Sequence, residues 1–247
     1  MRLALATIWI LFGFAIAGGL YWAFLITPVS TALALGATAL LALAVLALLG
    51  VTFNGAIEIW SRGFSLAGMR RSLGSIGSVV PAGLIVFVLW WLSSRVELSA
   101  AQNSGQINAW FIARFGWDDV SWLFTAIRYA AMWFTWVLGT LLAFSLMSAI
   151  LHSGWEEAGK PSWLGRAVRP RALLVATLAL VFLVALPWAY LVPWRPEGLP
   201  ASSVELAFIV TKLSVAGIAA AIALALIARE AAPSSAPLPA QPLIPDP

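Results

Sequence analysis

The feature that most constrains this chain is the segment 3–54, which contains no charged side chain. A helix crosses the hydrocarbon core of a membrane, which is about 30 Å thick, with about 20 apolar residues. The segment is too long for one crossing and must therefore turn back once. Pro28 marks that turn, because proline fits the first turn of a helix and disfavours helix at the residue before it.

Composition extends this interpretation to the rest of the chain. Of the 247 residues, 62% are hydrophobic and 10% are charged, whereas a soluble domain has about half apolar and about 25% charged residues. Water-soluble, disordered and collagen-like folds are therefore excluded. The absence of cysteine excludes disulfides, thiol chemistry and iron–sulfur clusters. The apolar segments lack the alternation of a barrel strand, so we expect helices.

The same reasoning predicts an all-α fold, a polytopic bundle of six transmembrane helices that forms one domain over residues 1–230. The predicted spans are 3–26, 28–54, 78–94, 122–151, 172–192 and 204–228. Arg2 and the motif Ala15-Ile16-Ala17 are similar to a signal peptide, but the apolar run continues without a break. We therefore expect an uncleaved first helix.

Two segments are expected outside the hydrocarbon core. Residues 129–151 already suffice to cross it, so residues 117–127 are predicted to form a helical extension. Asp118 and Asp119 suit the N-terminus of this extension, where free N–H groups and the helix dipole favour carboxylates. The proline-rich segment 231–247 predicts an extended or disordered tail that lies in the cytoplasm.

The basic residues give an orientation. Six spans place both termini on the same side as the second and fourth connections. That side carries nine basic residues: Arg2, Arg62, Arg70, Arg71, Lys160, Arg166, Arg169, Arg171 and Arg229. The opposite side carries Arg95, Arg114 and Arg195. Because basic loops face the cytoplasm, we expect cytoplasmic N- and C-termini in a bacterial-type inner membrane. The net charge of +4 then needs no nucleic-acid partner, and no nucleic-acid-binding motif is present.

Two connections predict amphipathic interfacial helices, one between spans 2 and 3 and one between spans 4 and 5. In the first, Leu66, Met69, Leu73 and Ile76 fall on one helical face. In the second, Trp163, Leu164 and Val168 form a similar face. The neighbouring basic residues are predicted to bind anionic lipid on the cytoplasmic side. These are Arg62, Arg70, Arg71, Arg166, Arg169 and Arg171.

The two connections also share the pattern Ser-x-x-Gly followed by basic residues. Ser65 and Gly68 in the first correspond to Ser162 and Gly165 in the second, at an offset of 97 residues. The pattern indicates a repeat of two spans and one basic interfacial helix, or alternatively two independent basic anchors. Small residues at i and i+4, as in Ala32-x-x-x-Gly36 and Gly217-x-x-x-Ala221, are typical of close helix packing.

Charged groups within spans are the better functional candidates, because burying them in a membrane is costly. Arg128 and Lys212 lie at the outer side, where they either snorkel or bind an acidic side chain, a lipid headgroup or a ligand carboxylate. The possible acidic partners are Glu97, Glu197 and Glu205. With Arg114, Trp110, Trp117 and Trp122, they form a candidate outer surface for an anionic or lipid ligand.

Glu58 and His152 lie at the inner ends of spans. Glu58 is predicted to pair with Arg62 one turn later. His152 is expected to act as a cation at a helix C-terminus, with a proton relay as the alternative. Because it is the only histidine, bis-histidine haem and multi-histidine zinc sites are excluded.

No catalytic motif is present, so we expect neither an enzyme nor a cofactor or metal. The sequence favours a non-catalytic scaffold or accessory subunit of a membrane complex. The alternatives are a small transporter or channel, and a protein that binds or handles lipids. The expected partners are membrane lipids, which are anionic on the cytoplasmic face, and other membrane subunits or further copies of this chain.

Overall fold

The computed structural model describes residues 1–27, 31–117, 119–195 and 203–233, and this part of the chain contains helices and no strand. Within it, six helical segments are long and apolar enough to cross a membrane. They are Arg2–Ile26, Ala32–Arg62, Ile76–Gln102, Ser121–Ser153, Pro170–Leu191 and Val204–Ala231. The chain is therefore a polytopic α-helical membrane protein, which confirms the predicted fold class.

The spans form three sequential pairs. The first is α1 (Arg2–Ile26) and α2 (Ala32–Arg62). The second is α4 (Val79–Gln102) and the continuous helix of α6 (Ser121–Trp133), η2 (Phe134–Leu138) and α7 (Gly139–Ser153). The third is α9 (Pro170–Leu180), η4 (Val181–Ala185) and η5 (Pro187–Leu191), paired with α10 (Ser203–Ala231). The segments η2, η4 and η5 are single π-helical turns.

Short helices connect these pairs. After α2 come α3 (Leu66–Gly74) and the 3-10 turn η1 (Ile76–Ser78). After α4 comes α5 (Ser104–Phe115), and after α7 come η3 (Trp155–Gly159) and α8 (Ser162–Ala167). The predicted interfacial helices are thus present as α3 and α8.

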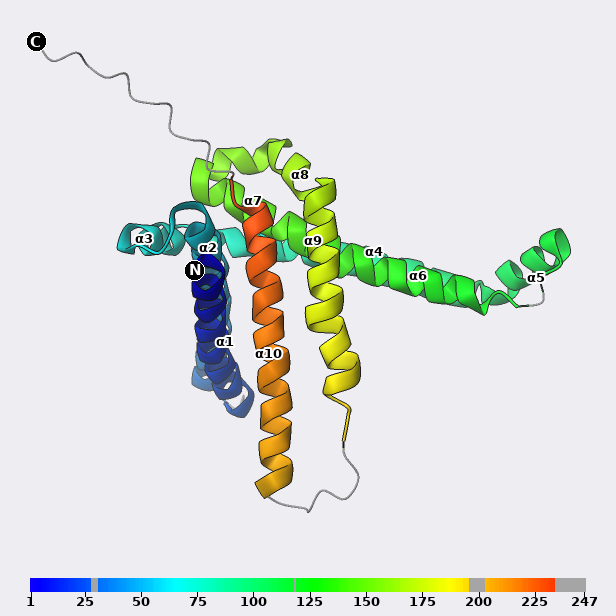
Figure 1. Cartoon of the computed structure of the whole chain (residues 1–247), viewed down its shortest axis with the longest axis horizontal. Coiled ribbons are helices and arrows are strands. Elements are labelled where there is room, and N and C mark those ends of the chain that lie inside the picture. The colour runs from blue at the N-terminus through cyan, green and yellow to red at the C-terminus, as the bar shows by residue number, and fades with distance from the viewer. Residues whose placement is uncertain (28–30, 118, 196–202, 234–247) are drawn as a thin grey trace, which may run out of the picture.

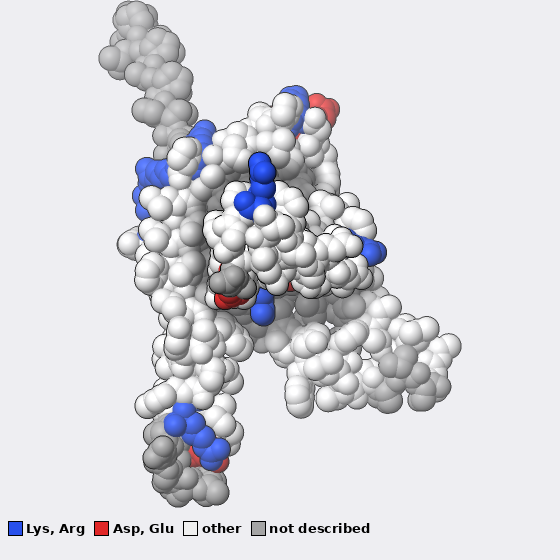
Figure 2. Space-filling view, turned by 90° about the vertical axis from the view of Figure 1, so that its right-hand side faces the viewer, with Lys and Arg blue, Asp and Glu red and all other residues white. Residues whose placement is uncertain are grey.

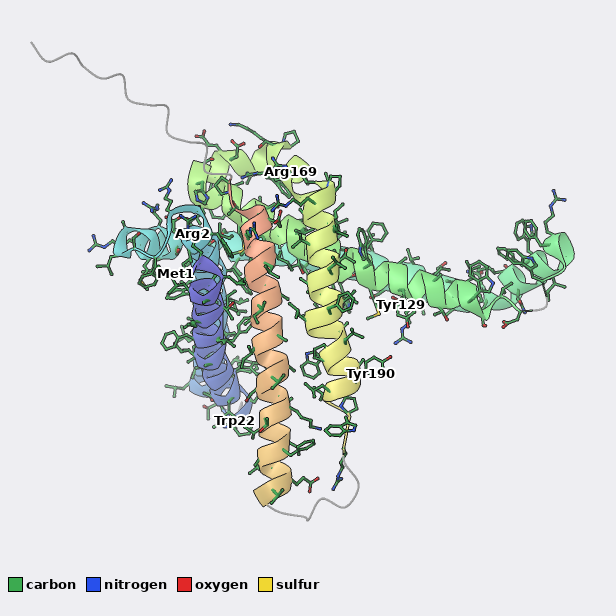
Figure 3. All side chains as sticks on the ribbon, viewed as in Figure 1. Met1, Arg2, Trp22, Tyr129, Arg169 and Tyr190 are labelled. Atoms are coloured by element: carbon green, nitrogen blue, oxygen red, sulfur yellow. The ribbon has the colours of Figure 1, made fainter. Side chains whose placement is uncertain are left out.

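The three helix pairs diverge from one common end (Figures 1 and 2). We refer to this end as the hub, made of residues 2–10, 54–78, 141–172 and 221–233. The diverging parts are arm 1 (residues 11–53), arm 2 (79–140) and arm 3 (173–220). Figure 3 shows Met1, Arg2 and Arg169 at the hub, whereas Trp22 and Tyr190 lie far along arms 1 and 3.

Most large buried side chains lie in the hub. Ile57, Met147 and Ile227 are at most 1% exposed there, where α2, α7 and α10 contact one another. Large apolar side chains of the arms are exposed instead, for example Leu40 at 68% and Tyr190 at 72%. Exposed apolar helices are stable in lipid, which is as apolar as the side chains themselves. The hub is therefore the packed core, and the arms present apolar surface.

Helices α1 and α2 approach each other at two glycines. A Cβ at Gly13 would overlap the side chain of Thr52, and one at Gly55 would overlap the indole of Trp9. The predicted packing glycines, Gly36 and Gly217, both have open space beside them. The prediction is wrong for these two glycines because they face away from the neighbouring helices, whereas Ala221, the partner of Gly217 in the motif, is fully buried.

Several predicted boundaries also change. Span 2 was predicted to end at Asn54, but α2 continues to Arg62 because its polar residues find partners in the hub. Span 3 was predicted to end at Ser94, but α4 continues to Gln102. Polar groups there are satisfied locally, since the Arg95 guanidinium lies 5.3 Å from the ring of Trp91.

The predicted helical extension starts later than expected. It begins at Ser121, where Asp119 accepts hydrogen bonds from the Ser121 amide (2.8 Å) and hydroxyl (3.0 Å). These bonds to the carboxylate lower the pKa of Asp119. Pro28, Asp118 and the tail beyond residue 233 lie outside the described residues.

The structure does not support a repeat at an offset of 97 residues. The Ser65 hydroxyl caps α3 by accepting from the Gly68 amide (3.0 Å), whereas the Ser162 hydroxyl donates to the carboxylate of Glu157. An equivalence does exist at a different offset. Gly63 and Gly154, which are 91 residues apart, end α2 and α7 with φ of 87° and 85°.

Residues at this second offset contact each other where α2 packs against α7. The ring centroids of Phe53 and Phe144 are 5.2 Å apart, and His152 Nε2 lies 3.1 Å from Ser61 Oγ. α2 and α7 therefore end in the same turn and pack through equivalent residues.

Candidate functional site

The most polar buried site in the described residues surrounds Glu58 in the hub. Its side chain is 3% exposed and forms an ion pair with Arg71. His152 Nε2 lies 3.5 Å from the other carboxylate oxygen, Oε2, and also contacts Ser61. The prediction that Glu58 pairs with Arg62 is wrong, because α3 folds back over α2 and brings Arg71 to the carboxylate.

Small residues allow α3 to lie directly against α2. A Cβ at Gly68 would come within 2.7 Å of Glu58 Cγ. Gly68 and Ser72 are buried, whereas Leu66 and Leu73 are 79% and 54% exposed. Two residues of the predicted apolar face, Leu66 and Leu73, are thus turned away from the hub and can contact lipid, whereas Met69 and Ile76 are half-buried.

Asn54 forms a second buried polar contact in the hub. Its amide Nδ2 donates to the Ser75 carbonyl (2.9 Å) and to Ser78 Oγ (3.1 Å). Asn54 and Ser78 are both fully buried. These bonds join α2 to the turn that leads into α4 and so fix the start of arm 2.

An apolar cleft of about 620 Å³ opens where arms 1 and 2 separate. Its walls come from α2, α4 and the helix of α6, η2 and α7, with Leu224 of α10 at the base. Phe87 and Trp136, which line it, are 55% and 57% exposed. None of its lining residues carries a charge, so an occupant must be largely apolar.

Lys212 forms bonds within arm 3. Its ammonium donates to the carbonyls of Val192 (2.8 Å) and Trp194 (2.7 Å), at the end of the helix that starts with α9. It also lies 4.8 Å from the ring centroid of Phe208. Lys212 therefore obtains its partners from the backbone.

Arg128 lies on arm 2, where it lines an open cavity of about 360 Å³ together with Glu97 of α4. Its neighbours there differ completely from those of Lys212, so the structure does not bring the two cations to one ligand. Acidic Glu205 instead pairs with Arg195, at 2.9 Å. Glu197 lies outside the described residues.

The predicted outer aromatic residues do come together, at the tip of arm 2. Rings of α5, of the connection after it and of the start of α6 form one chain of contacts with centroid distances of 5.0 to 5.7 Å. Arg114, in the last turn of α5, is exposed beside them. The ring chain contains Trp110, Phe111, Phe115, Trp117 and Trp122.

The basic residues predicted to bind lipid divide into groups. Arg71 forms an ion pair with Glu58, whereas Arg62 and Arg70 are exposed. Arg166 is partly buried, and its pKa is lowered by that burial and by nearby Arg169. Arg169 and Arg171 lie at the start of α9 and line a hub cavity described below.

That cavity also contains residues that the sequence analysis did not select as ligand candidates, namely Arg2, Trp60 and Arg229. Arg2 lies at the start of the first span and Arg229 near the end of the last one. A topology with both termini on one side brings such residues to the same face. The position of these basic residues at the predicted cytoplasmic ends of the first and last spans is therefore the sequence signal that predicts the cavity.

No group of three or more His, Cys, Asp or Glu side chains within the described ranges could hold a metal ion. Comparison of the chain with protein-family models, with curated proteins and with solved structures finds no match. The fold and the site thus define a class, polytopic α-helical membrane proteins, and within that class this chain is characterised by its three diverging arms.

Proposed function

We propose that this protein is a non-catalytic scaffold or accessory subunit that receives a transmembrane helix of a partner protein between arms 1 and 2. The proposal is carried by the apolar cleft of about 620 Å³, which has uncharged walls on three helices. Helices associate in membranes through close van der Waals packing and hydrogen bonds. The Thr135 hydroxyl already bonds to Ser93 Oγ at 3.1 Å, so packing would dominate this contact.

A photocrosslinking amino acid at Trp136, inside the cleft, tests this proposal. In native membranes we expect a protein adduct of discrete mass. The control position is Leu178 on arm 3, which is 47% exposed and outside the cleft lining, and it should form adducts with lipid alone. Lipid adducts alone at both positions would contradict the scaffold proposal.

Lipid binding is the second candidate function. The same cleft suits acyl chains, since its wall offers Phe87 and Trp136 and no charge. In the crosslinking experiment this function gives one defined lipid species at Trp136 and mixed lipids at Leu178. Transport receives less support, because Lys212 is already bound by two carbonyls of its own arm.

The proposed location is a bacterial-type inner membrane with the hub at the cytoplasmic face. The support is the excess of basic residues near the hub. Because the chain lacks cysteine, single cysteines can report the orientation. An impermeant maleimide added to intact cells should label Asn103→Cys, at the tip of arm 2, but not Ser153→Cys at the hub. The reverse labelling pattern would overturn the orientation.

A further inference from the structure

A second cavity lies in the hub, where both described ends of the chain meet. Its volume is about 440 Å³. Its walls come from the start of α1, the end of α2, the start of α9 and the end of α10. Figure 2 shows basic side chains gathered at the upper left, beside the start of the grey segment. The lining residues are Arg2, Trp60, Arg169, Arg171, Arg229, Glu230, Ala232 and Pro233.

The described lining has a strong excess of positive charge, with four guanidinium groups and one carboxylate. Glu230 interacts with Arg171 at 3.5 Å, which partly neutralises one of the four. The Arg166 side chain adds a further cation close to Arg169. Bringing several cations together is unfavourable unless an anion compensates them.

Trp60 holds two of the arginines in position. Arg2 Nη1 donates to the Trp60 carbonyl at 2.8 Å, and the Arg229 guanidinium lies 5.6 Å from the Trp60 ring centroid. The Trp60 indole itself donates to the Ala225 carbonyl at 2.7 Å, which fixes α2 against α10. The two guanidinium groups are therefore oriented by contacts with the half-buried Trp60, and both arginines remain exposed to solvent.

The start of α9 contributes a favourable field. Arg169 is its N-cap and Pro170 its first residue, so the first-turn N–H groups of this helix face the same region. The end of α10 opposes this field with free carbonyl groups, but Arg229 lies in its last turn and compensates them.

We propose that this hub cavity binds a phosphate-bearing group. Arginine is the residue best suited to phosphate, because its planar fork donates two parallel hydrogen bonds to a pair of oxygens. A group with two negative charges compensates the excess positive charge of the cavity lining better than a single carboxylate does. The volume lies within the range of small-molecule sites, about 300 to 1,000 Å³. This inference is independent of the scaffold proposal, which concerns a different cleft.

The phosphate has two possible sources, and both share this recognition chemistry. It is either the headgroup of an anionic phospholipid or a soluble compound with adjacent phosphates. The matched variants are Arg169→Gln with Arg229→Gln in the cavity, and Arg95→Gln with Lys160→Gln as the control, because neither control residue lines the cavity or belongs to the predicted lipid-binding set. Each pair removes two positive charges from exposed side chains, so the net charge falls equally in both.

Two probes distinguish the sources on the full-length protein. Inorganic pyrophosphate is titrated by calorimetry into protein in phosphatidylcholine nanodiscs. Cardiolipin binding is counted by native mass spectrometry after release from nanodiscs that contain phosphatidylcholine and cardiolipin. For whichever probe binds, we expect the cavity variant to lose roughly tenfold or more in affinity, because two charge-assisted contacts disappear.

Every outcome decides the proposal. Binding of cardiolipin alone assigns a lipid headgroup, and binding of pyrophosphate assigns a soluble phosphate compound. Equal losses in the cavity and control variants would overturn the site, as would a wild-type protein that binds neither probe. Thermal unfolding of both variants should match the wild type, since all four replaced side chains are exposed.

Discussion

The hub and the arms of this protein are built by opposite rules. In the hub, polar side chains such as Asn54, Glu58 and Ser78 are fully or almost fully buried and bonded across helices. In the arms, large apolar side chains such as Leu33, 85% exposed, lie on the surface. Within a membrane, apolar helix surfaces have no hydrophobic driving force to associate, because lipid is equally apolar. Polar contacts and close packing at small residues hold the helices together instead.

The difference explains the shape of the molecule. Most polar contacts between helix pairs occur where the arms meet, so the pairs converge there; one further bond, from the Trp133 indole to the Thr177 hydroxyl at 3.0 Å, joins arm 2 to arm 3. Farther out, each pair is held mainly by its own two helices, as at Gly13 and Thr52 in arm 1. The helix pairs therefore associate with one another mainly at the hub, and their far ends diverge.

The largest effect is expected from breaking the hub at Glu58. Replacing Glu58 with Ala removes the partner of Arg71 and a neighbour of His152. Loss of one partner of a buried pair costs about 3–5 kcal/mol, and Arg71, at 39% exposed, moves the expected cost to the lower end. The measurement is the unfolding free energy in mixed micelles titrated with dodecyl sulfate. Glu156→Ala, an exposed acid at the same end, is the control, and equal losses would contradict a special role for Glu58.

A packing test compares two glycines of arm 1. Gly13→Ala should cost about 1–3 kcal/mol, because the new methyl group overlaps Thr52 and overpacking is destabilising. Gly36→Ala meets open space and should be neutral or gain up to about 1 kcal/mol from helix propensity. Thermal unfolding in detergent distinguishes them. A reversed order would mean that α1 and α2 pack through the other glycine.

Two asparagine substitutions, one in the hub and one in an arm, compare the two regions directly. Asn54→Ala should cost about 1–2 kcal/mol, because a buried amide and its partner Ser78 lose their bonds. Asn103→Ala, which removes an exposed bond to the Ser99 carbonyl at the tip of arm 2, should stay within about 0.5 kcal/mol. The same micelle titration measures both, and similar costs would remove the distinction between hub and arm.

Within the arms, Lys212 is the cation with the most contacts. Lys212→Met should weaken the join between α10 and the end of η5 by about 0.6–1.7 kcal/mol. Faster amide exchange over residues 187–194 is the expected signature. Arg128→Met, on arm 2, should leave that exchange unchanged. Identical exchange in wild type and Lys212→Met would show that the two carbonyl bonds are not needed there.

The smallest effect concerns pH at the edge of the hub. Hydrogen bonds from Ser162 and Lys160 lower the pKa of Glu157 below its ordinary value of 4.5. A carboxyl with a lowered folded pKa stabilises the fold above its unfolded pKa, and the stabilisation is lost as pH falls through the folded value. Proteolysis between residues 155 and 168 should therefore increase in acid. Glu157→Gln should abolish this pH dependence, whereas Glu156→Gln should keep it.

The sequence predicts how many helices there are far better than how they pack. Charge-free length and the spacing of apolar residues are local properties, so the six spans follow from the first and the interfacial helices from the second. The partner of Glu58 does not follow, because the i,i+4 rule considers one helix and Arg71 arrives from another. The gathering of Trp110, Trp117 and Trp122 could be predicted from their closeness in the chain. The divergence of the arms could not, because periodicity gives helix lengths and faces but no crossing angles.

The bond from the Trp60 indole to the Ala225 carbonyl has a consequence for biosynthesis. Its two residues are 165 positions apart, whereas each arm closes between neighbouring spans. At about 5–20 residues per second, Trp60 is inserted about 8–33 s before its acceptor exists. The arms can therefore form one by one as they leave the ribosome, and the hub is completed only after the last helix is made. A truncated nascent chain would hold stable hairpins around an unfinished centre, which is where a membrane chaperone or protease would find it.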